Sequence, residues 1–243
     1  MNNISVADLN ELKNKYQGES LDTALKRVSE GYPIQYLIGD VNFCGNKIIV
    51  NENVLIPRYE TEFLVELVIN TLKDDYSGNI LDIGTGSGCI SISVAKKLTN
   101  SKITAVDISA EAVKVALENC KINNVNNVEV INKDLFEMNN FDGYEIIISN
   151  PPYVSFDEEV GEETKYEPQN AIFTDDKGLK FYKSIIDKVS KTNTKVTNIF
   201  FEIGMNQGSD IISYSADVLP DYKADIIKDL AGKDRYIHIY LNK

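Results

Sequence analysis

Histidine and paired cysteines are scarce in this chain of 243 residues. Its one histidine, His238, excludes a multi-histidine metal site and nearly excludes histidine-based catalysis. The three cysteines, Cys44, Cys89 and Cys120, are far apart and form no CxxC pair. They predict neither a disulfide framework nor a zinc site. We therefore expect no bound metal and a reducing, cytoplasmic environment.

Basic charge and long apolar runs are also scarce. Lys and Arg number 25 against 37 Asp and Glu, which gives a formal net charge of −12. Nucleic-acid-binding proteins usually carry a basic stripe, so direct binding of nucleic acid is not expected. No apolar run approaches the length of a membrane span, and Met1 to Ile4 do not resemble the start of a signal peptide. We expect a monomer that does not associate with membranes.

The hydrophobic pattern at the start of the chain predicts helices. Apolar residues recur at helix spacing between residues 5 and 31, and Ser5 and Ser20 are candidate N-caps. Between residues 36 and 50 the pattern changes to short strands, which predicts a β-hairpin. The expected turn glycines are Gly39 and Gly45.

From residue 58 onward, predicted strands and helices alternate. The expected strands are 80–83, 102–106, 128–131, 144–149, 199–203, 223–227 and 236–241, and the expected helices are 60–72, 90–98, 110–119, 179–189 and 207–216. This alternation predicts a mostly parallel sheet covered on both faces. The connection 228–235 is too short for a parallel crossover, so the last two strands should be antiparallel. The expected parts are a helical segment (1–32), a hairpin connector (33–57) and a Rossmann-like domain (58–243).

The motif Asn150-Pro151-Pro152-Tyr153 directly follows the apolar run 146–149. Its two prolines stop the backbone from continuing as strand or helix, which leaves an amide side chain at the tip of a strand. Such a loop can hold a planar NH2 group during a reaction. A stiff turn between two elements is an equal alternative on these residues alone.

A glycine-rich loop follows the first strand of the repeating unit and opens a helix. In Asp82-Ile83-Gly84-Thr85-Gly86-Ser87-Gly88, the glycines allow positive φ and let backbone N–H groups approach a ligand closely. The G-x-G-x-G spacing differs from the dinucleotide fingerprint, and the loop lacks the Lys-Ser/Thr ending of a phosphate loop. Alone, this loop is weak evidence for a cofactor.

Acidic residues follow the next two strands. Asp107 suits the hydroxyls of a ribose, and Asp134 can accept from an adenine amine while Leu135 covers the ring. With the glycine loop, these strand ends offer contacts to methionine, ribose and adenine in turn, as in S-adenosylmethionine enzymes. The alternative, a tight turn with two solvated aspartates, leaves this spacing unexplained. We predict S-adenosylmethionine as cofactor and S-adenosylhomocysteine as product.

From about Pro33 to Arg235, the chain resembles the HemK/PrmC-type protein-(glutamine-N5) methyltransferases. Asn-Pro-Pro-Tyr is shared with DNA and RNA amino-methyltransferases, whereas Pro-Arg-Tyr-Glu-Thr-Glu and Tyr-Glu-Pro are specific to this family. Relative to the family, the helical segment at the start is expected to be shortened. The segments that carry the resemblance, besides the glycine loop and the Asn-Pro-Pro-Tyr motif, are 33–39, 55–62, 166–168, 176–179, 201–204 with Gln207, and 228–235.

The resemblance implies the class I S-adenosylmethionine-dependent methyltransferase fold. It also implies methyl transfer to the glutamine amide in a Gly-Gly-Gln motif of peptide chain release factors. Asn150 and the Pro151 carbonyl would receive this amide, with Pro152 and Tyr153 beside it. A ribosomal-protein glutamine or a nucleic-acid base amine is the alternative substrate. The net charge and the Pro-Arg-Tyr-Glu-Thr-Glu segment favour the release factor.

Charged residues outside these motifs have less defined roles. Glu202 ends an apolar strand, where a buried carboxylate needs a partner. Arg58 lies at a helix start, where it either caps the helix or orders the cofactor and substrate region. Arg235 is expected in a structural ion pair and His238 in packing or on the surface. Since no general base is evident, orientation, exclusion of water and electrostatics remain the means of catalysis.

Overall fold

The computed structural model describes residues 5–242 and contains a central seven-stranded sheet. Its strands are β3 (Asn79–Ile83), β4 (Lys102–Asp107), β5 (Val128–Asn132), β6 (Ile146–Ser149), β9 (Asn198–Glu202), β10 (Tyr222–Lys228) and β11 (Asp234–Leu241). They lie in the order β10-β11-β9-β6-β3-β4-β5. The strands from β9 to β5 in this order are parallel, and β11 is antiparallel to both of its neighbours. The predicted α/β class with an antiparallel last strand is confirmed.

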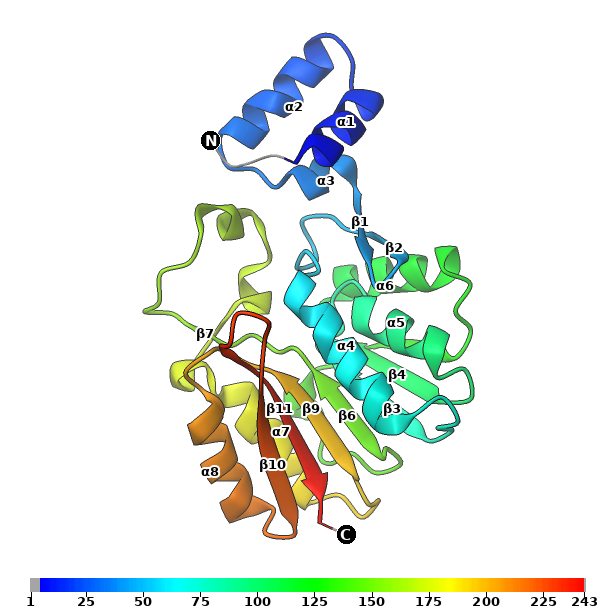
Figure 1. Cartoon of the computed structure of the whole chain (residues 1–243), viewed down its shortest axis with the longest axis vertical. Helices are drawn as coiled ribbons and strands as arrows, with labels where there is room; N and C mark the ends of the chain where they lie inside the picture. Colours follow the sequence, from blue (N-terminus) through cyan, green and yellow to red (C-terminus); the bar gives the residue numbers. More distant parts are fainter. Residues whose placement is uncertain (1–4, 243) are drawn as a thin grey trace.

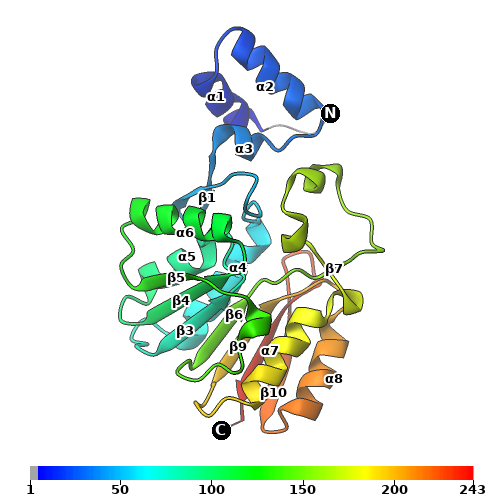
Figure 2. The same ribbon diagram turned by 180° about the vertical axis from the view of Figure 1, so that it is seen from behind.

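Helices cover both faces of this sheet. They are α4 (Tyr59–Leu72), α5 (Cys89–Lys97), α6 (Ala110–Ile122), α7 (Lys180–Ser190) and α8 (Gly208–Val218). The first three lie on one face and the last two on the other (Figures 1 and 2). Successive residues of a strand point to opposite faces, so Phe200 packs in the core beside α4 and α5, and Phe201 in the core beside α7 and α8. Double coverage explains why all four residues of β6 are buried.

Three short helices precede the sheet. They are α1 (Val6–Lys15), α2 (Glu19–Ser29) and α3 (Ile34–Ile38), and they enclose a small core of their own around Leu12 and Leu37. The hairpin of β1 (Asp40–Phe43) and β2 (Asn46–Ile49) connects them to the sheet domain (Figure 1). No helix among residues 5–242 is long and apolar enough to span a membrane. The division of the chain at residues 32 and 57 stays a prediction.

Three local predictions near the start of the chain are wrong. Ser5 caps α1 as expected, accepting from the Asp8 N–H at 3.0 Å, but α2 already begins at Glu19 and Ser20 lies in its first turn. Residues 36–38 are helical rather than extended, because the apolar side chains of α3 pack against α1 and α2. Gly39, with φ +92°, ends this helix and makes no hairpin turn.

The long segment between β6 and α7 reaches back toward the first three helices (yellow-green in Figure 1). It contains β7 (Val154–Ser155), β8 (Phe173–Thr174) and the 3-10 turns Glu162–Tyr166, Gln169–Ala171 and Asp176–Gly178. The ring of Tyr166 packs edge-on against Tyr32, with centroids 5.1 Å apart. The segment therefore joins the helical start of the chain to the turn that follows β6.

Candidate active site

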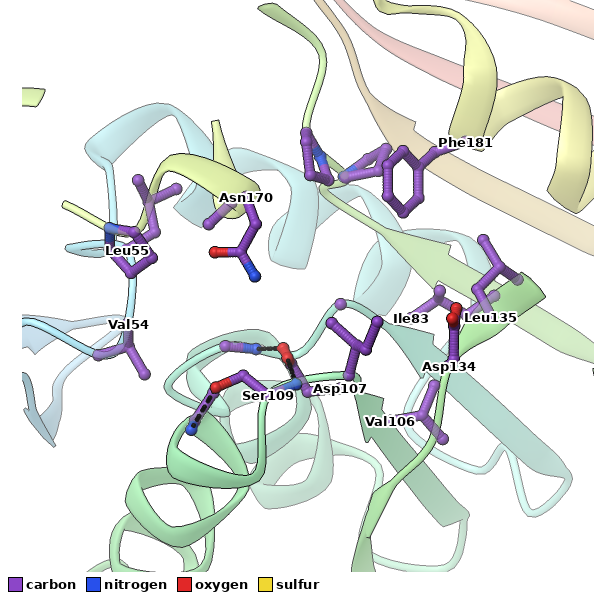
Figure 3. A pocket seen from close by; sticks show the side chains of 18 of the residues that line it. Val54, Leu55, Ile83, Val106, Asp107, Ser109, Asp134, Leu135, Asn170 and Phe181 are labelled. Atoms are coloured by element: carbon purple, nitrogen blue, oxygen red, sulfur yellow. Dashed lines mark hydrogen bonds between the residues drawn. The ribbon is translucent and has the colours of Figure 1, made fainter. Parts of the chain in front are cut away.

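A cavity of about 830 Å³, including space open to solvent, lies at the carboxyl ends of the parallel strands (Figure 3). Open α/β sheets bind their ligands at this edge. The predicted site residues that line it are Gly84, Gly86, Asp107, Asp134, Leu135, Asn150, Pro151 and Pro152. The fold thus brings the glycine loop, two acidic strand ends and the Asn-Pro-Pro turn to one place.

The glycines of the loop after β3 serve two different purposes. Gly84 and Gly86 have φ of +73° and +56°, and a Cβ there would meet no atom of the described chain within 4 Å. Their backbone is therefore open toward the cavity. Gly88, with φ +79°, is tightly packed, because its Cβ would lie 3.2 Å from that of Ala116. Gly88 belongs to the contact with α6 rather than to the cavity wall.

Asp82 and Thr85 lie behind the loop and shape it. Asp82 is fully buried, and its Oδ2 accepts from Thr85 Oγ1 at 2.7 Å and from Ser91 Oγ at 2.6 Å. Its Oδ1 has no hydrogen-bond partner within residues 5–242, and burial raises the pKa of Asp82 to about 6. Because Asp82 does not line the cavity, it holds the loop in shape from behind rather than facing a ligand. Ser87 is also buried, and its carbonyl accepts from Asn119 Nδ2 at 2.9 Å.

Asp107 is a rigid acceptor at the cavity wall. Its Oδ2 accepts from the Gly86 N–H at 2.8 Å and its Oδ1 from the Ser109 N–H at 2.9 Å (Figure 3). Burial raises the pKa of this carboxyl above its usual range. Each oxygen keeps a further lone pair for a ligand, so the group suits two neighbouring hydroxyls.

Apolar side chains complete the far wall of the cavity. Leu135 is buried there, and the Asp134 Oδ1 accepts from the Phe136 N–H at 2.8 Å. Ile108 is 60% exposed and Phe136 42%, which leaves apolar surface for a flat ring to cover. Sequence reasoning missed Ile108 and Phe136, although both directly follow residues or motifs that it selected.

Two more cavity residues lie beyond the Asn-Pro-Pro-Tyr turn, one in the segment before α7 and one in α7 itself. The amide of Asn170 points into the cavity, and the ring of Phe181 lies at its rim (Figure 3). Asn170 stands two positions after Pro168, which the family motif includes. Proximity to that motif was the available signal for Asn170. Phe181 had none, because it lies in a regular helix.

Asn150 and Tyr153 are held from outside the cavity. Asn150 Nδ2 donates to Thr61 Oγ1 at 3.2 Å, and the Tyr153 carbonyl accepts from Gln207 Nε2 at 2.8 Å. Gln207 Oε1 in turn accepts from the Gly204 N–H at 2.9 Å. Burial raises the pKa of Tyr153 to about 12, so its phenol is protonated at neutral pH. Tyr153 packs beside the turn in the core with α7 and α8 and does not line the cavity.

Arg58 joins the connector to the segment after the turn. It forms an ion pair with Glu167, whose Oε1 also accepts from the Ile56 N–H at 3.0 Å. Glu167 is buried, so the pair anchors two segments that are distant in sequence. Neither interpretation of Arg58 from the sequence identified Glu167 as its partner. The expectation for Arg235 is confirmed by its ion pair with Asp229, at 3.5 Å from Nε to Oδ2.

His238 has a packing role, as expected. Its half-buried ring stacks on Phe200, with centroids 4.4 Å apart. Its Nε2 lies 2.8 Å from Asn198 Oδ1, on the neighbouring strand β9. Burial lowers the pKa of His238, which favours the neutral ring.

The comparisons with known proteins agree with this arrangement. Residues 59–174 match the family described as methyltransferase small domain. The fold is similar to that of the ribosomal protein L11 methylase from Lactobacillus delbrueckii subsp. bulgaricus. The TM-score is 0.55 at 20% identity, over 76% of this chain and 81% of that chain. With the glycine loop after β3 and the Asn-Pro-Pro turn after β6, the fold is that of a class I methyltransferase.

Relatives of known family are found over most of the chain. The release factor glutamine methyltransferase of Fusobacterium nucleatum is 38% identical over 243 residues, covering 97% of this chain and 68% of the relative. That of Lactococcus lactis is 41% identical over 217 residues, covering 88% and 79%. The chain belongs to the release factor glutamine methyltransferase family, and the resemblance inferred from its motifs is confirmed.

Proposed function

We propose that this protein transfers a methyl group from S-adenosylmethionine to the side-chain amide nitrogen, N5, of the glutamine in a Gly-Gly-Gln motif of peptide chain release factors. The supporting observation is the position of Asn150 and Pro151. Both line the same cavity as the glycine loop, Asp107 and Asp134. The hydrogen-bond acceptors for a substrate amide therefore lie in the same cavity as the residues that would hold the methyl donor.

The residues of the cavity suit this cofactor. Asp107 would accept from the ribose hydroxyls and Asp134 from the adenine amine, while Leu135 and Ile108, which line the same cavity, would cover the ring. The open backbone of the glycine loop faces the methionine part, and Asp82, Thr85, Ser87 and Gly88 keep the loop in shape. When bound, S-adenosylmethionine supplies an electrophilic methyl group on a positively charged sulfur.

An amide nitrogen is a poor nucleophile, because its lone pair is delocalised into its carbonyl. The turn after β6 supplies groups that can increase its reactivity. The Asn150 Oδ1 and the Pro151 carbonyl oxygen each accept one hydrogen of the substrate NH2 group. Two acceptors orient the nitrogen and draw electron density toward it. Such positioning contributes about 7–11 kcal/mol to lowering a barrier. Pro152 and Tyr153 hold the turn rigid, and the proton leaves the product nitrogen to water.

Labelled methyl transfer tests this function. The purified chain is incubated with methyl-labelled S-adenosylmethionine and four acceptors: a release factor, the same factor with Gln→Ala in its Gly-Gly-Gln motif, ribosomal proteins, and DNA or RNA. We expect label on the unaltered release factor alone. Label on the Gln→Ala factor, or on nucleic acid in place of the factor, contradicts the proposal.

A further inference from the structure

A buried polar chain leads from Asn150 away from the cavity. Asn150 Nδ2 donates to Thr61 Oγ1 at 3.2 Å, and Thr61 Oγ1 donates to Glu202 Oε2 at 2.7 Å. Thr61, on α4, is 3% exposed, and Glu202, at the end of β9, is 1% exposed. Neither side chain lines the cavity. Asn150 therefore links these two buried side chains to the cavity.

The donor and acceptor chemistry of Asn150, Thr61 and Glu202 sets the direction of these two hydrogen bonds. An ionised carboxylate only accepts, so the Thr61 hydroxyl donates its one hydrogen to Glu202. The hydroxyl oxygen then has only lone pairs to offer, and it accepts from the NH2 of Asn150. With its NH2 held inward, Asn150 presents its oxygen to the cavity. A reversed side chain would present donors to a substrate NH2 group, which also only donates.

We infer that Thr61 and Glu202 are positioning residues of the methyl transfer, and that they hold Asn150 with its side-chain oxygen toward the substrate amide. This inference rests on the proposed function. It assigns Glu202 the partner that its burial requires, since a carboxylate without hydrogen bonds is costly in a protein interior. It also gives Thr61, a member of the Pro-Arg-Tyr-Glu-Thr-Glu segment, a role in the reaction.

The charge of Glu202 controls the direction of the hydrogen bonds that connect it to Asn150 through Thr61. Burial raises the pKa of Glu202 to about 7, against the lowering effects of Thr61, Arg235 and Asn150. A protonated Glu202 can donate to Thr61, which then donates to Asn150 and turns its NH2 group toward the cavity. Turnover therefore requires an ionised Glu202. The other titratable groups that face it are Glu60 on α4, Arg235 and Tyr236 on β11, Tyr153 after β6 and Tyr182 on α7.

Substitutions at Thr61 separate a positioning role from a packing role. Thr61→Val keeps the shape and removes the hydroxyl, and Thr61→Ser keeps the hydroxyl. Thr71→Val is the matched control on the exposed side of α4, where the hydroxyl donates to the Leu67 carbonyl. With a release factor as substrate, we expect Thr61→Val to lower kcat about 10- to 100-fold, the effect of losing one or two buried hydrogen bonds. Thr61→Ser should stay within about threefold of the wild type and Thr71→Val should match it. The KM for S-adenosylmethionine should stay within about twofold in all three.

The pH dependence of kcat, measured with saturating substrates, gives the second readout. We expect the wild-type kcat to fall as the pH decreases through about 7, the pKa of Glu202. Glu202→Gln should have a lower kcat that no longer shows this fall. Circular dichroism confirms the fold of each variant, and if Thr61→Val is unfolded, the profile of Glu202→Gln decides.

Three results have distinct meanings. A folded Thr61→Val protein with wild-type kcat, or a Glu202→Gln protein that keeps the wild-type fall in kcat at low pH, overturns the positioning inference alone. A wild-type protein that does not methylate the release factor overturns the proposed function and the inference with it. The expected pattern, in which Thr61→Ser retains the kcat that Thr61→Val loses, supports both the proposed function and the positioning role.

Discussion

The loop 82–88 and Asp107, here called the glycine-loop wall, face the Asn-Pro-Pro-Tyr turn across one cavity. The two sides are held in place in different ways. The hydrogen bonds that fix Asp82 and Asp107 on the wall join side chains to groups 2 to 21 positions away in the chain. Those that fix Asn150 and Tyr153 on the turn reach 89 and 54 positions. The bond behind Asn150, between Thr61 and Glu202, joins residues 141 positions apart.

This difference has a consequence for function. The wall is a local structure, so changes elsewhere in the chain should leave cofactor binding largely intact. The turn depends on α4, β9 and the segment before α7 all being in place. Substitutions in any of these elements should therefore lower turnover more than they lower cofactor affinity.

The largest effect is expected from Asn150→Ala. Removing a polar group that acts on the reacting atoms typically costs about 100- to 1,000-fold in kcat. Because Asn150 belongs to the turn, the dissociation constant for S-adenosylmethionine, measured by calorimetry, should change by less than about threefold. Asn150→Asp keeps an acceptor but adds a charge, and serves as the comparison. Near-normal turnover of Asn150→Ala would falsify the proposed role of the turn.

Gly178→Ala tests how the turn is supported from the segment before α7. Gly178 has φ +82°, and a Cβ there would lie 2.1 Å from the Tyr153 carbonyl oxygen and 2.1 Å from Gln207 Nε2. We expect a loss of about 3 kcal/mol in the free energy of unfolding from this overlap and the backbone strain together.

Gly232→Ala is the matched control for that substitution. Its φ is +77°, and a Cβ there would meet no atom of the described residues within 4 Å. Strain alone should cost about 1 kcal/mol. Urea unfolding of the two variants measures the difference, and equal losses would show that contact with the turn is not what makes Gly178 necessary.

The pH dependence of stability tests one buried carboxyl on each side of the cavity. The pKa of Asp82 is raised to about 6 and that of Glu202 to about 7, from ordinary values of 3.8 and 4.5. Between the unfolded and folded values, the folded chain retains protons that the unfolded chain has released. The contribution of these groups is therefore fully present at low pH, and the free energy of unfolding falls as the pH rises through this window.

Glu202→Gln isolates the contribution of the turn side. Between pH 4.5 and 7.5, we expect wild-type stability to fall by about 3 kcal/mol more than that of the variant. Repulsion within the acidic chain is nearly the same in both proteins and largely cancels in this difference. Denaturant unfolding at the two pH values provides the measurement, and parallel curves would mean that Glu202 titrates normally.

The smallest effect is expected from Asp107→Ala, on the wall. Loss of its hydrogen bonds to the ribose should raise the dissociation constant for S-adenosylmethionine about tenfold. At saturating cofactor, kcat should stay within about threefold, because the turn is unchanged. Calorimetry and steady-state kinetics separate the two quantities, and a fall in kcat without loss of affinity would reverse the assignment of wall and turn.

Most of the fold follows from the sequence because strong patterns cover the sheet domain. Alternating apolar strands and amphipathic helices predicted each element of the sheet, with ends that differ by a few residues. The errors fall in the helical start, at Ser20 and at residues 36–39. Residues 36–38 are apolar and suit a strand, but packing on α1 and α2 makes them helical.

The two sides of the cavity also differ in how much of their structure could be predicted from the sequence. Asp107 ends a strand, and Asp134 and Asn150 follow one. Parallel strands bring their carboxyl ends to one edge, so the convergence of these residues follows from their order along the chain. The pairing of Asn150 with Thr61, and of Thr61 with Glu202, follows from no spacing. It depends on how α4 packs against β9, which is settled by side chains throughout the core beside them. Local motifs therefore specify the chemistry of this protein, and long-range packing specifies the orientation in which Asn150 presents it.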